Sequence, residues 1–203
     1  MEQPIRARLV HQEEGLTIYA VNGTPVDCIK LALNDLVPRL PDYIFSGMNH
    51  GFNYGNCVTY SGTMGVVFEG SFYGIPSIGF SYGSHDHGVD LTPCEPIIRQ
   101  GIELIMNNKF EPGTCFNLNI PVCENILGLK VAINARGRWM HEYEKRIDPF
   151  GKPYYWTTGS YVASEPNNPL NDVTLLEQGY ATIAPCTADQ TLHSAIEELD
   201  KLL

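Results

Sequence analysis

The sequence predicts an α/β domain in which a mostly parallel sheet is covered by helices on both faces. Short runs rich in β-branched and aromatic residues alternate with segments whose apolar residues recur every three or four positions. Of the 203 residues, 43% are hydrophobic and 18% are charged, which suits a substantial core. Strands that alternate with helices pair in parallel and need a helical layer on each face. We expect residues 1–203 to form a single domain.

The first predicted elements are a strand at 16–21 and a helix that ends near residue 36. The strand has β-branched and aromatic residues, Thr24 can cap the helix, and Pro25 suits its first position. The residues before 16 are only weakly patterned. A short strand at 42–46 follows, and then a loop at 47–60 that is rich in glycine and asparagine.

The remaining elements continue the alternation of helices and strands. We predict a helix at 61–73, a strand at 76–81, a helix capped by the box Thr92-Pro93-Cys94-Glu95, strands at 115–120 and 129–135, and a last helix capped by residues 187–190. The two later helices bury apolar stripes, which are Ile98, Ile102 and Ile105 in one and Leu192, Ile196, Leu199 and Leu203 in the other.

Residues 137–176 interrupt this pattern. They have four prolines, several aromatic residues and little periodicity, and long irregular segments in compact domains are usually functional. Tyr154, Tyr155 and Trp156 would form an unfavourable apolar patch if they were left in water. We interpret the stretch as an arm, extended at 152–158, that packs on another subunit. The alternative is an arm folded back on its own domain.

The loop at 47–60 is the predicted functional site, because ligands in parallel sheets bind beyond the carboxyl ends of the strands. Its glycines let the backbone approach a ligand closely, and the oxygens of Asn49 and Asn53 suit Mg or Mn. His50 is a candidate to line the same site. Glycine and asparagine also make ordinary tight turns, so the segment alone leaves both interpretations open.

Ser61, Gly62 and Thr63 follow the loop at the predicted start of a helix. The first amides of a helix have no partner within it, so this segment can bind a phosphate group. Plain capping by Ser61 or Thr63 is the alternative, and the position directly after the glycine loop favours the phosphate interpretation. His85, Asp86 and His87 resemble part of a metal site, but their spacing on a loop favours a solvated segment or a contact at the rim of the site.

Composition and charge exclude several other classes of protein. A net charge of −10 argues against sequence-independent nucleic-acid binding, and no apolar run reaches the roughly 20 residues of a membrane span. The six cysteines are scattered without a Cys-x-x-Cys pair, which indicates reduced thiols and a cytoplasmic protein. No Walker loop, nucleophile elbow or Gly-x-Gly-x-x-Gly motif occurs, so a dinucleotide-dependent enzyme is disfavoured.

Taken in order, the motifs resemble the SurE survival-protein family. The resemblance is carried by Gly23-Thr24-Pro25-Val26-Asp27-Cys28, Ser46-Gly47-Met48-Asn49 with Gly51, Asn53 and Gly55, Tyr60-Ser61-Gly62-Thr63 with Glu69-Gly70, and Asn117-Leu118-Asn119-Ile120-Pro121. It covers nearly the whole chain.

The resemblance implies an enzyme that hydrolyses nucleoside 5′- and 3′-monophosphates with a divalent metal cation, Mg or Mn. It further implies a homodimer or homotetramer built through exchanged carboxy-terminal elements. The resemblance also implies a Rossmann-like core, and on the residues of this chain it places Asn49 at the metal and Ser61, Gly62 and Thr63 at the phosphate. Asn53 and His50, in the glycine loop itself, are our further candidates for contact with the substrate.

The chain departs from the family pattern at the metal site. Family members begin with a strand that ends in Asn-Asp-Asp-Gly, whose aspartates are the main metal ligands, and no Asp-Asp pair occurs in this sequence. The match begins only near residues 5–9, so the resemblance implies that about 50–60 family residues are missing upstream. We therefore expect impaired hydrolysis. The alternative is a non-catalytic oligomer that binds phosphate or nucleotide.

Overall fold

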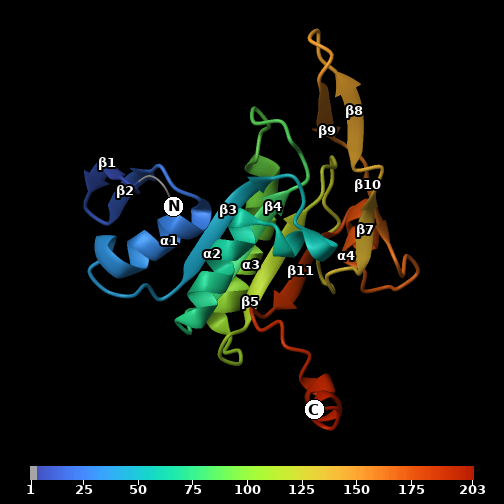
Figure 1. Ribbon diagram of the computed structural model, residues 1–203. Helices are drawn as coiled ribbons and strands as arrows, with labels where there is room; N and C mark the ends of the chain where they lie inside the picture. The colour runs from blue at the N-terminus through green and yellow to red at the C-terminus, as the bar shows by residue number, and fades with distance from the viewer. Residues whose placement is uncertain (1–3) are drawn as a thin grey trace.

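The computed structural model describes residues 4–203 and has a five-stranded central sheet with helices on both faces (Figure 1). The central strands are β3 (Ile44–His50), β4 (Ser77–Tyr82), β5 (Cys115–Ile120), β11 (Ala181–Cys186) and β6 (Leu129–Val131), in that spatial order. Three of the four pairings are parallel, and only β5 and β11 are antiparallel. The predicted fold class is confirmed.

The helices and the peripheral strands surround this sheet. The helices are α1 (Pro25–Leu31), α2 (Gly62–Phe72), α3 (Glu95–Asn107), α4 (Asp172–Glu177) and α5 (Ile196–Asp200). Three antiparallel strand pairs lie outside the sheet, namely β1 (Ala7–Glu13) with β2 (Leu16–Val21), β7 (Gly137–Met140) with β10 (Ser160–Ala163), and β8 (Tyr143–Ile147) with β9 (Pro153–Thr157). Within residues 4–203, every helix is too short or too polar to span a bilayer.

The alternation of side chains along β4 explains the two layers. Ile78 and Phe80 point into the core on the α3 side, where they pack near Gly101. Gly79 points to the other face, where a Cβ atom would lie 2.8 Å from the Met64 sulfur of α2. Successive strand residues face opposite sides, so a strand buried on both faces brings both helices close.

Local chemistry fixes the starts of α1 and α2 as predicted. Thr24 and Asp27 form a reciprocal capping box, in which the Thr24 hydroxyl accepts from the Asp27 amide and the Asp27 carboxylate accepts from the Thr24 amide. The Ser61 hydroxyl accepts from the Met64 amide at 3.1 Å. A π-helical turn, Ala32–Leu36, extends α1 to the predicted end.

The amino-terminal strand prediction is right in position and wrong in partner. Residues 16–21 form β2, but β2 pairs with β1, which was not predicted, and both strands lie outside the central sheet (Figure 1). The prediction failed because β1 has no clear alternation of apolar and polar residues, and its side chains are exposed.

The predicted cap of the α3 helix is also wrong. Thr92–Cys94 forms a 3-10 turn, and the Thr92 amide is bonded to the Asp90 carboxylate at 2.9 Å. Glu95 pairs with Arg99 on the helix surface instead of reaching back to a cap. Asp90 competes as the local acceptor, so the helix begins at Glu95 without a side-chain cap.

Strand β11 was missed, and the strand at 129–135 is shorter than predicted. Alanines and Pro185 weaken the strand pattern of β11, yet it pairs on both sides, with β5 and with β6. The carboxy-terminal helix is also shorter. The Asp189 side chain accepts from the Thr191 amide, which makes a turn, and α5 begins only at Ile196.

Residues 137–176 contain two antiparallel strand pairs, β7 with β10 and β8 with β9. The β8–β9 hairpin points away from the sheet (Figure 1), and β9 covers most of the stretch predicted at 152–158. The end of the segment differs, because Asn171 caps α4 and Leu175 and Leu176 are buried against the domain. The contact with another subunit stays a prediction.

We predict that Gly101→Val destabilises the fold by about 1–3 kcal/mol, although valine is the better helix former. A Cβ atom at Gly101 would lie 2.7 Å from the Leu118 Cδ1 atom in a closely packed layer. Urea unfolding measures the cost. Gln100→Val, at the exposed neighbouring position, controls for helix propensity, and equal costs at the two positions would contradict close packing of α3 on the sheet.

Candidate functional site

The candidate site lies at the carboxyl-end edge of β3, β4 and β5, where residues 51–61 connect β3 to α2. β3 runs to His50, so Asn49 and His50 lie at the end of this strand and not in the loop where they were predicted. The register of β3 against β4 shifts between Ser46 and Asn49, and beyond this irregularity Asn49 and His50 pair again with Ser81 and Tyr82. The site therefore begins on a rigid element.

Buried asparagines hold the loop against the sheet. The Asn119 side-chain oxygen accepts from the Asn53 amide at 2.8 Å, and the Asn117 side chain donates to the Asn53 carbonyl at 2.7 Å. The Asn53 side chain donates to the Ser81 hydroxyl at 2.7 Å. Asn117 and Asn119 are at most 1% exposed. The amide and carbonyl groups of Asn53 in the loop thus form their hydrogen bonds with side chains of the sheet.

Sequence reasoning placed Asn53 beside the substrate, and it used Asn117 and Asn119 only as part of a motif. In the structure Asn53 is 6% exposed and is bonded at three points, so it has a clear structural role. Its contact with a substrate stays a prediction. The signal for the other two was present, because two asparagines at alternate positions of an otherwise apolar strand need buried partners.

Asp172 holds the far end of the loop. Its carboxylate accepts from the amides of Gly55 at 2.8 Å, Ala135 at 3.0 Å and Val173 at 2.8 Å. Burial raises the pKa of the Asp172 carboxyl above its ordinary value, while the backbone hydrogen bonds act in the opposite direction. Sequence reasoning missed Asp172, because its partner Gly55 lies 117 positions away.

The structure brings together the residues predicted for phosphate and metal. Ser61 caps α2, Gly62 and Thr63 form its first turn, and the Thr63 hydroxyl lies 3.4 Å from the Asn49 Oδ1 atom. Among the described residues, the amides of Gly62 and Thr63 have no backbone acceptor. Two free amides at a helix start, with a hydroxyl beside them, make a suitable environment for an anion.

Asn49 is oriented by its own loop. Its side-chain nitrogen donates to the Gly51 carbonyl at 2.8 Å and to the His50 carbonyl at 3.3 Å. The nitrogen is therefore engaged on the side of the backbone, and the oxygen faces Thr63.

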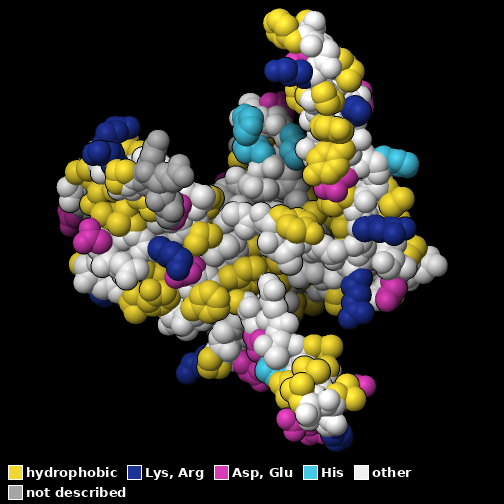
Figure 2. Space-filling view, in the orientation of Figure 1, with side chains coloured by type: hydrophobic (Ala, Val, Ile, Leu, Met, Phe, Trp, Pro, Cys, Tyr) yellow, Lys and Arg dark blue, Asp and Glu magenta, His cyan; other side chains and the backbone are white. Residues whose placement is uncertain are grey.

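Three histidines gather at the same edge. The rings of His50 and His87 meet edge to face with centroids 4.5 Å apart, and the His85 ring covers Gly51. Histidine side chains are seen together in the upper middle of the view, to the left of the projecting hairpin (Figure 2). In the described part of the chain, the Nδ1 atom of His50 is a buried polar atom without a partner. The loop with His85 and His87 therefore lies against His50 and Gly51, and its contact with a substrate stays a prediction.

These residues do not fit a complete divalent metal site. Magnesium and manganese are usually held by carboxylates, whereas Asn49 and Thr63 provide neutral oxygens. Between residues 4 and 203, no cluster of three or more His, Cys, Asp or Glu side chains is arranged to hold a metal. Asn49 alone could be one ligand of a larger set.

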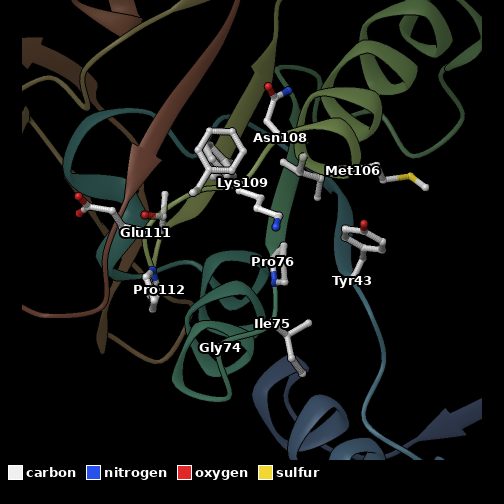
Figure 3. Close-up of a pocket in the computed structure, with 14 residues that line it drawn as sticks. Tyr43, Gly74, Ile75, Pro76, Met106, Asn108, Lys109, Glu111 and Pro112 are labelled. Atoms are coloured by element: carbon white, nitrogen blue, oxygen red, sulfur yellow. The ribbon is translucent and has the colours of Figure 1, made fainter.

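A cavity of about 370 Å³ lies at the opposite edge of the sheet, where β3, β4 and β5 begin. Tyr43, Pro76, Asn108 and Lys109 are among its lining residues (Figure 3). This is the edge at which parallel strands start, and ligands of such sheets bind at the other edge. The asparagine-lined edge is therefore the better candidate.

We predict that Asp172→Asn destabilises the protein by about 1–3 kcal/mol, because an amide cannot accept all three backbone N–H groups. Because the pKa of Asp172 is higher in the folded protein than in the unfolded chain, its protonation stabilises the fold, fully so below pH 3.8. This contribution is lost as the pH rises through the pKa that Asp172 has in the folded protein. The cost should therefore shrink between pH 3.8 and neutrality in urea unfolding. Asp35→Asn, at an exposed aspartate, is the control. A cost that grows with pH would disprove this account.

Known proteins resemble the chain along its whole length. A family model described as Survival protein SurE matches residues 1–141. The chain is 45% identical to 5'-nucleotidase SurE from Bacteroides thetaiotaomicron over 199 residues, which cover 97% of this chain and 76% of that protein. It is 40% identical to 5'-nucleotidase SurE from Bacteroides fragilis over 197 residues, with coverage of 97% and 77%.

A solved structure shows the same fold. The crystal structure of SurE protein from Aquifex aeolicus matches with a TM-score of 0.81 and 29% identity, over 100% of this chain and 81% of that one. The sequence motifs, which meet at one edge of the sheet, and these matches indicate the same family. The chain therefore belongs to the SurE family.

Proposed function

We propose that the chain is a phosphomonoesterase that acts on nucleoside 5′-monophosphates and releases nucleoside and phosphate. The observation that carries this proposal is the meeting of the Thr63 hydroxyl with the Asn49 oxygen at the start of α2. The names of the relatives, which are 5'-nucleotidases, support the choice of substrate. Activity on 3′-monophosphates is part of the same proposal.

The phosphate is bound by the start of α2. The amides of Gly62 and Thr63 donate to its oxygens, the Thr63 hydroxyl turns its proton from Asn49 to the phosphate, and Ser61 shapes the turn by accepting from the Met64 amide. Hydrolysis breaks the bond between phosphorus and the ribose oxygen, and a water oxygen takes its place. Positioning and charge stabilisation account for most of the catalysis in such reactions. His50, His85 and His87 gather beside Gly51 of the same loop.

A divalent cation, Mg or Mn, belongs to the proposal with Asn49 as one of its ligands. When bound, such a cation neutralises phosphate charge and lowers the pKa of water. The carboxylates implied by the family resemblance do not occur here as an Asp-Asp pair. We therefore propose that hydrolysis by this chain is impaired. The second candidate is a non-catalytic oligomer that binds phosphate or nucleotide, which the lack of a carboxylate cluster in residues 4–203 favours.

The assembly is proposed to be a homodimer or homotetramer in the cytoplasm. The β8–β9 hairpin presents Tyr143, Ile147, Tyr155 and Trp156 with more than half of each side chain exposed. A projecting hairpin with this much apolar surface is typical of an interface. A monomer in analytical ultracentrifugation at micromolar concentration would contradict this part of the proposal.

We predict that Thr63→Val weakens the binding of inorganic phosphate about tenfold, because a hydrogen bond to a charged group is lost. Isothermal titration calorimetry measures the affinity, and circular dichroism checks that the fold is kept. Thr59→Val is the matched control, because Thr59 is exposed and its hydroxyl donates only to the Asn56 carbonyl. Unchanged phosphate affinity in Thr63→Val would favour plain capping at this helix start.

We predict slow, manganese-stimulated release of phosphate from guanosine 5′-monophosphate by this chain. The physical reason is that one neutral amide oxygen holds a dication weakly. A malachite green assay with added Mn²⁺, and with EDTA as the control, measures the rate. Phosphate binding without any release would support the non-catalytic candidate. Full activity in EDTA would show that the metal assignment is wrong.

A further inference from the structure

A cavity of about 600 Å³ is lined in part by Phe52 and Tyr54, which belong to the loop that joins β3 to α2. Its floor is made by the residues that follow β4 and β5, namely Gly83, Pro121 and Val122, and α4 closes another side with Glu177. The volume falls within the roughly 300–1,000 Å³ that small-molecule sites have. The proposed phosphate site and the hydrogen bonds that hold the loop assign no role to this cavity.

One wall of the cavity is aromatic. The rings of Phe52 and Tyr54 have centroids 5.2 Å apart, Tyr54 and Tyr161 are 5.3 Å apart, and Tyr161 and Trp139 are 5.9 Å apart. The Tyr161 hydroxyl donates to the Ala135 carbonyl at 2.7 Å, which fixes the middle of the wall. Flat aromatic surfaces that are fixed and half-buried suit a flat aromatic ligand.

The wall is continuous with the phosphate site through the loop backbone. Asn49 donates to the Gly51 carbonyl, and Phe52 is the next residue. Asn53 faces the sheet, whereas Phe52 and Tyr54 on either side of it line the cavity. Contacts therefore link the two places, since Thr63 meets Asn49, Asn49 is bonded to Gly51, and Gly51 precedes Phe52 in the chain.

The charges of the cavity exclude a second phosphate group. Among the described residues that line it, none is Lys or Arg, and Glu177 is the one charged side chain. A carboxylate accepts hydrogen bonds only, so Glu177 selects ligands with N–H donors. The chemistry is that of a nucleobase and not of an anion.

We propose that this cavity binds the base of the nucleotide, stacked on Phe52 and Tyr54, with Glu177 accepting from the N–H groups of guanine. The inference rests on the proposed function, since it places the base relative to the phosphate at α2. It assigns a binding place to the base, which the phosphate site does not contact. Guanine is preferred because it offers two adjacent N–H donors to one carboxylate.

The test measures nucleoside binding without any phosphate, so it does not depend on catalysis. In a Trp156→Phe background, Trp139 is the one tryptophan left of the two in the sequence, and its fluorescence reports on the cavity. Guanosine should quench it in a saturable way, while ribose 5-phosphate should not. Phe52→Leu should weaken guanosine binding about tenfold, in keeping with the loss of base stacking on a ring.

A second variant keeps the test informative if Phe52→Leu disturbs the loop. Val122→Trp, at a position 57% exposed, fills the cavity from its floor and should also abolish guanosine binding; it is measured by calorimetry because it adds a tryptophan. Glu177→Gln should reduce the preference for guanosine over adenosine. Phe72→Leu, at an exposed aromatic residue at the end of α2, is the matched control and should change nothing.

The outcomes separate this inference from the proposed function. Absence of quenching at millimolar guanosine, or equal affinities in the parent, Phe52→Leu and Val122→Trp, would overturn the base cavity. Guanosine binding that is lost in both variants supports it, even if no phosphate is released from any nucleotide. In that case only the catalytic part of the proposed function fails.

Discussion

The geometry of the candidate site depends on one set of buried hydrogen bonds, those between the sheet asparagines and the backbone of the glycine loop. Asn117 and Asn119 lie where a parallel sheet normally has apolar side chains, and they bond the amide and carbonyl of Asn53. Buried polar groups are costly when they are unpaired, so this arrangement tolerates one loop conformation and few others. The loop owes its fixed position to its partners in the sheet.

The rigid loop and the helix start meet because α1 packs tightly on α2. A Cβ atom at Gly62 would lie 2.8 Å from Pro25, and one at Gly65 would lie 2.6 Å from Val26. Lys30 and Glu69 join the same helices by an ion pair of 3.3 Å. The glycines that open α2 therefore serve packing as well as ligand access, and the amides at its first turn stay free for an anion.

The site joins parts with different physical character. At the start of α2, hydroxyl and amide donors suit a phosphate, whereas the aromatic wall beyond Phe52 suits an uncharged flat ring. The histidines of the rim lie between solvent and loop. Such a division, with charge recognised at one end and shape at the other, is what a nucleotide requires of its binding protein.

Much of the local structure could be predicted from the sequence. Caps at Thr24 and Ser61, the bounds of β2 and β5, and the segment from Ser61 to Thr63 follow from preferences that act within three or four residues. Where two local acceptors compete, as at Asp90 and Thr92, the sequence pattern gave the wrong cap. Strand β11 was missed because its neighbours, and not its composition, make it a strand.

The sequence by itself determined the family motifs, the order of most elements and the chemical type of the candidate residues. Only the tertiary structure decided which of them meet. Thr63 reaches Asn49 across 14 positions, Asn53 reaches Asn119 across 66, and Gly55 reaches Asp172 across 117. Contacts between residues so far apart in the sequence depend on how helices and strands pack around one core. Side-chain preferences along a short segment do not determine that packing.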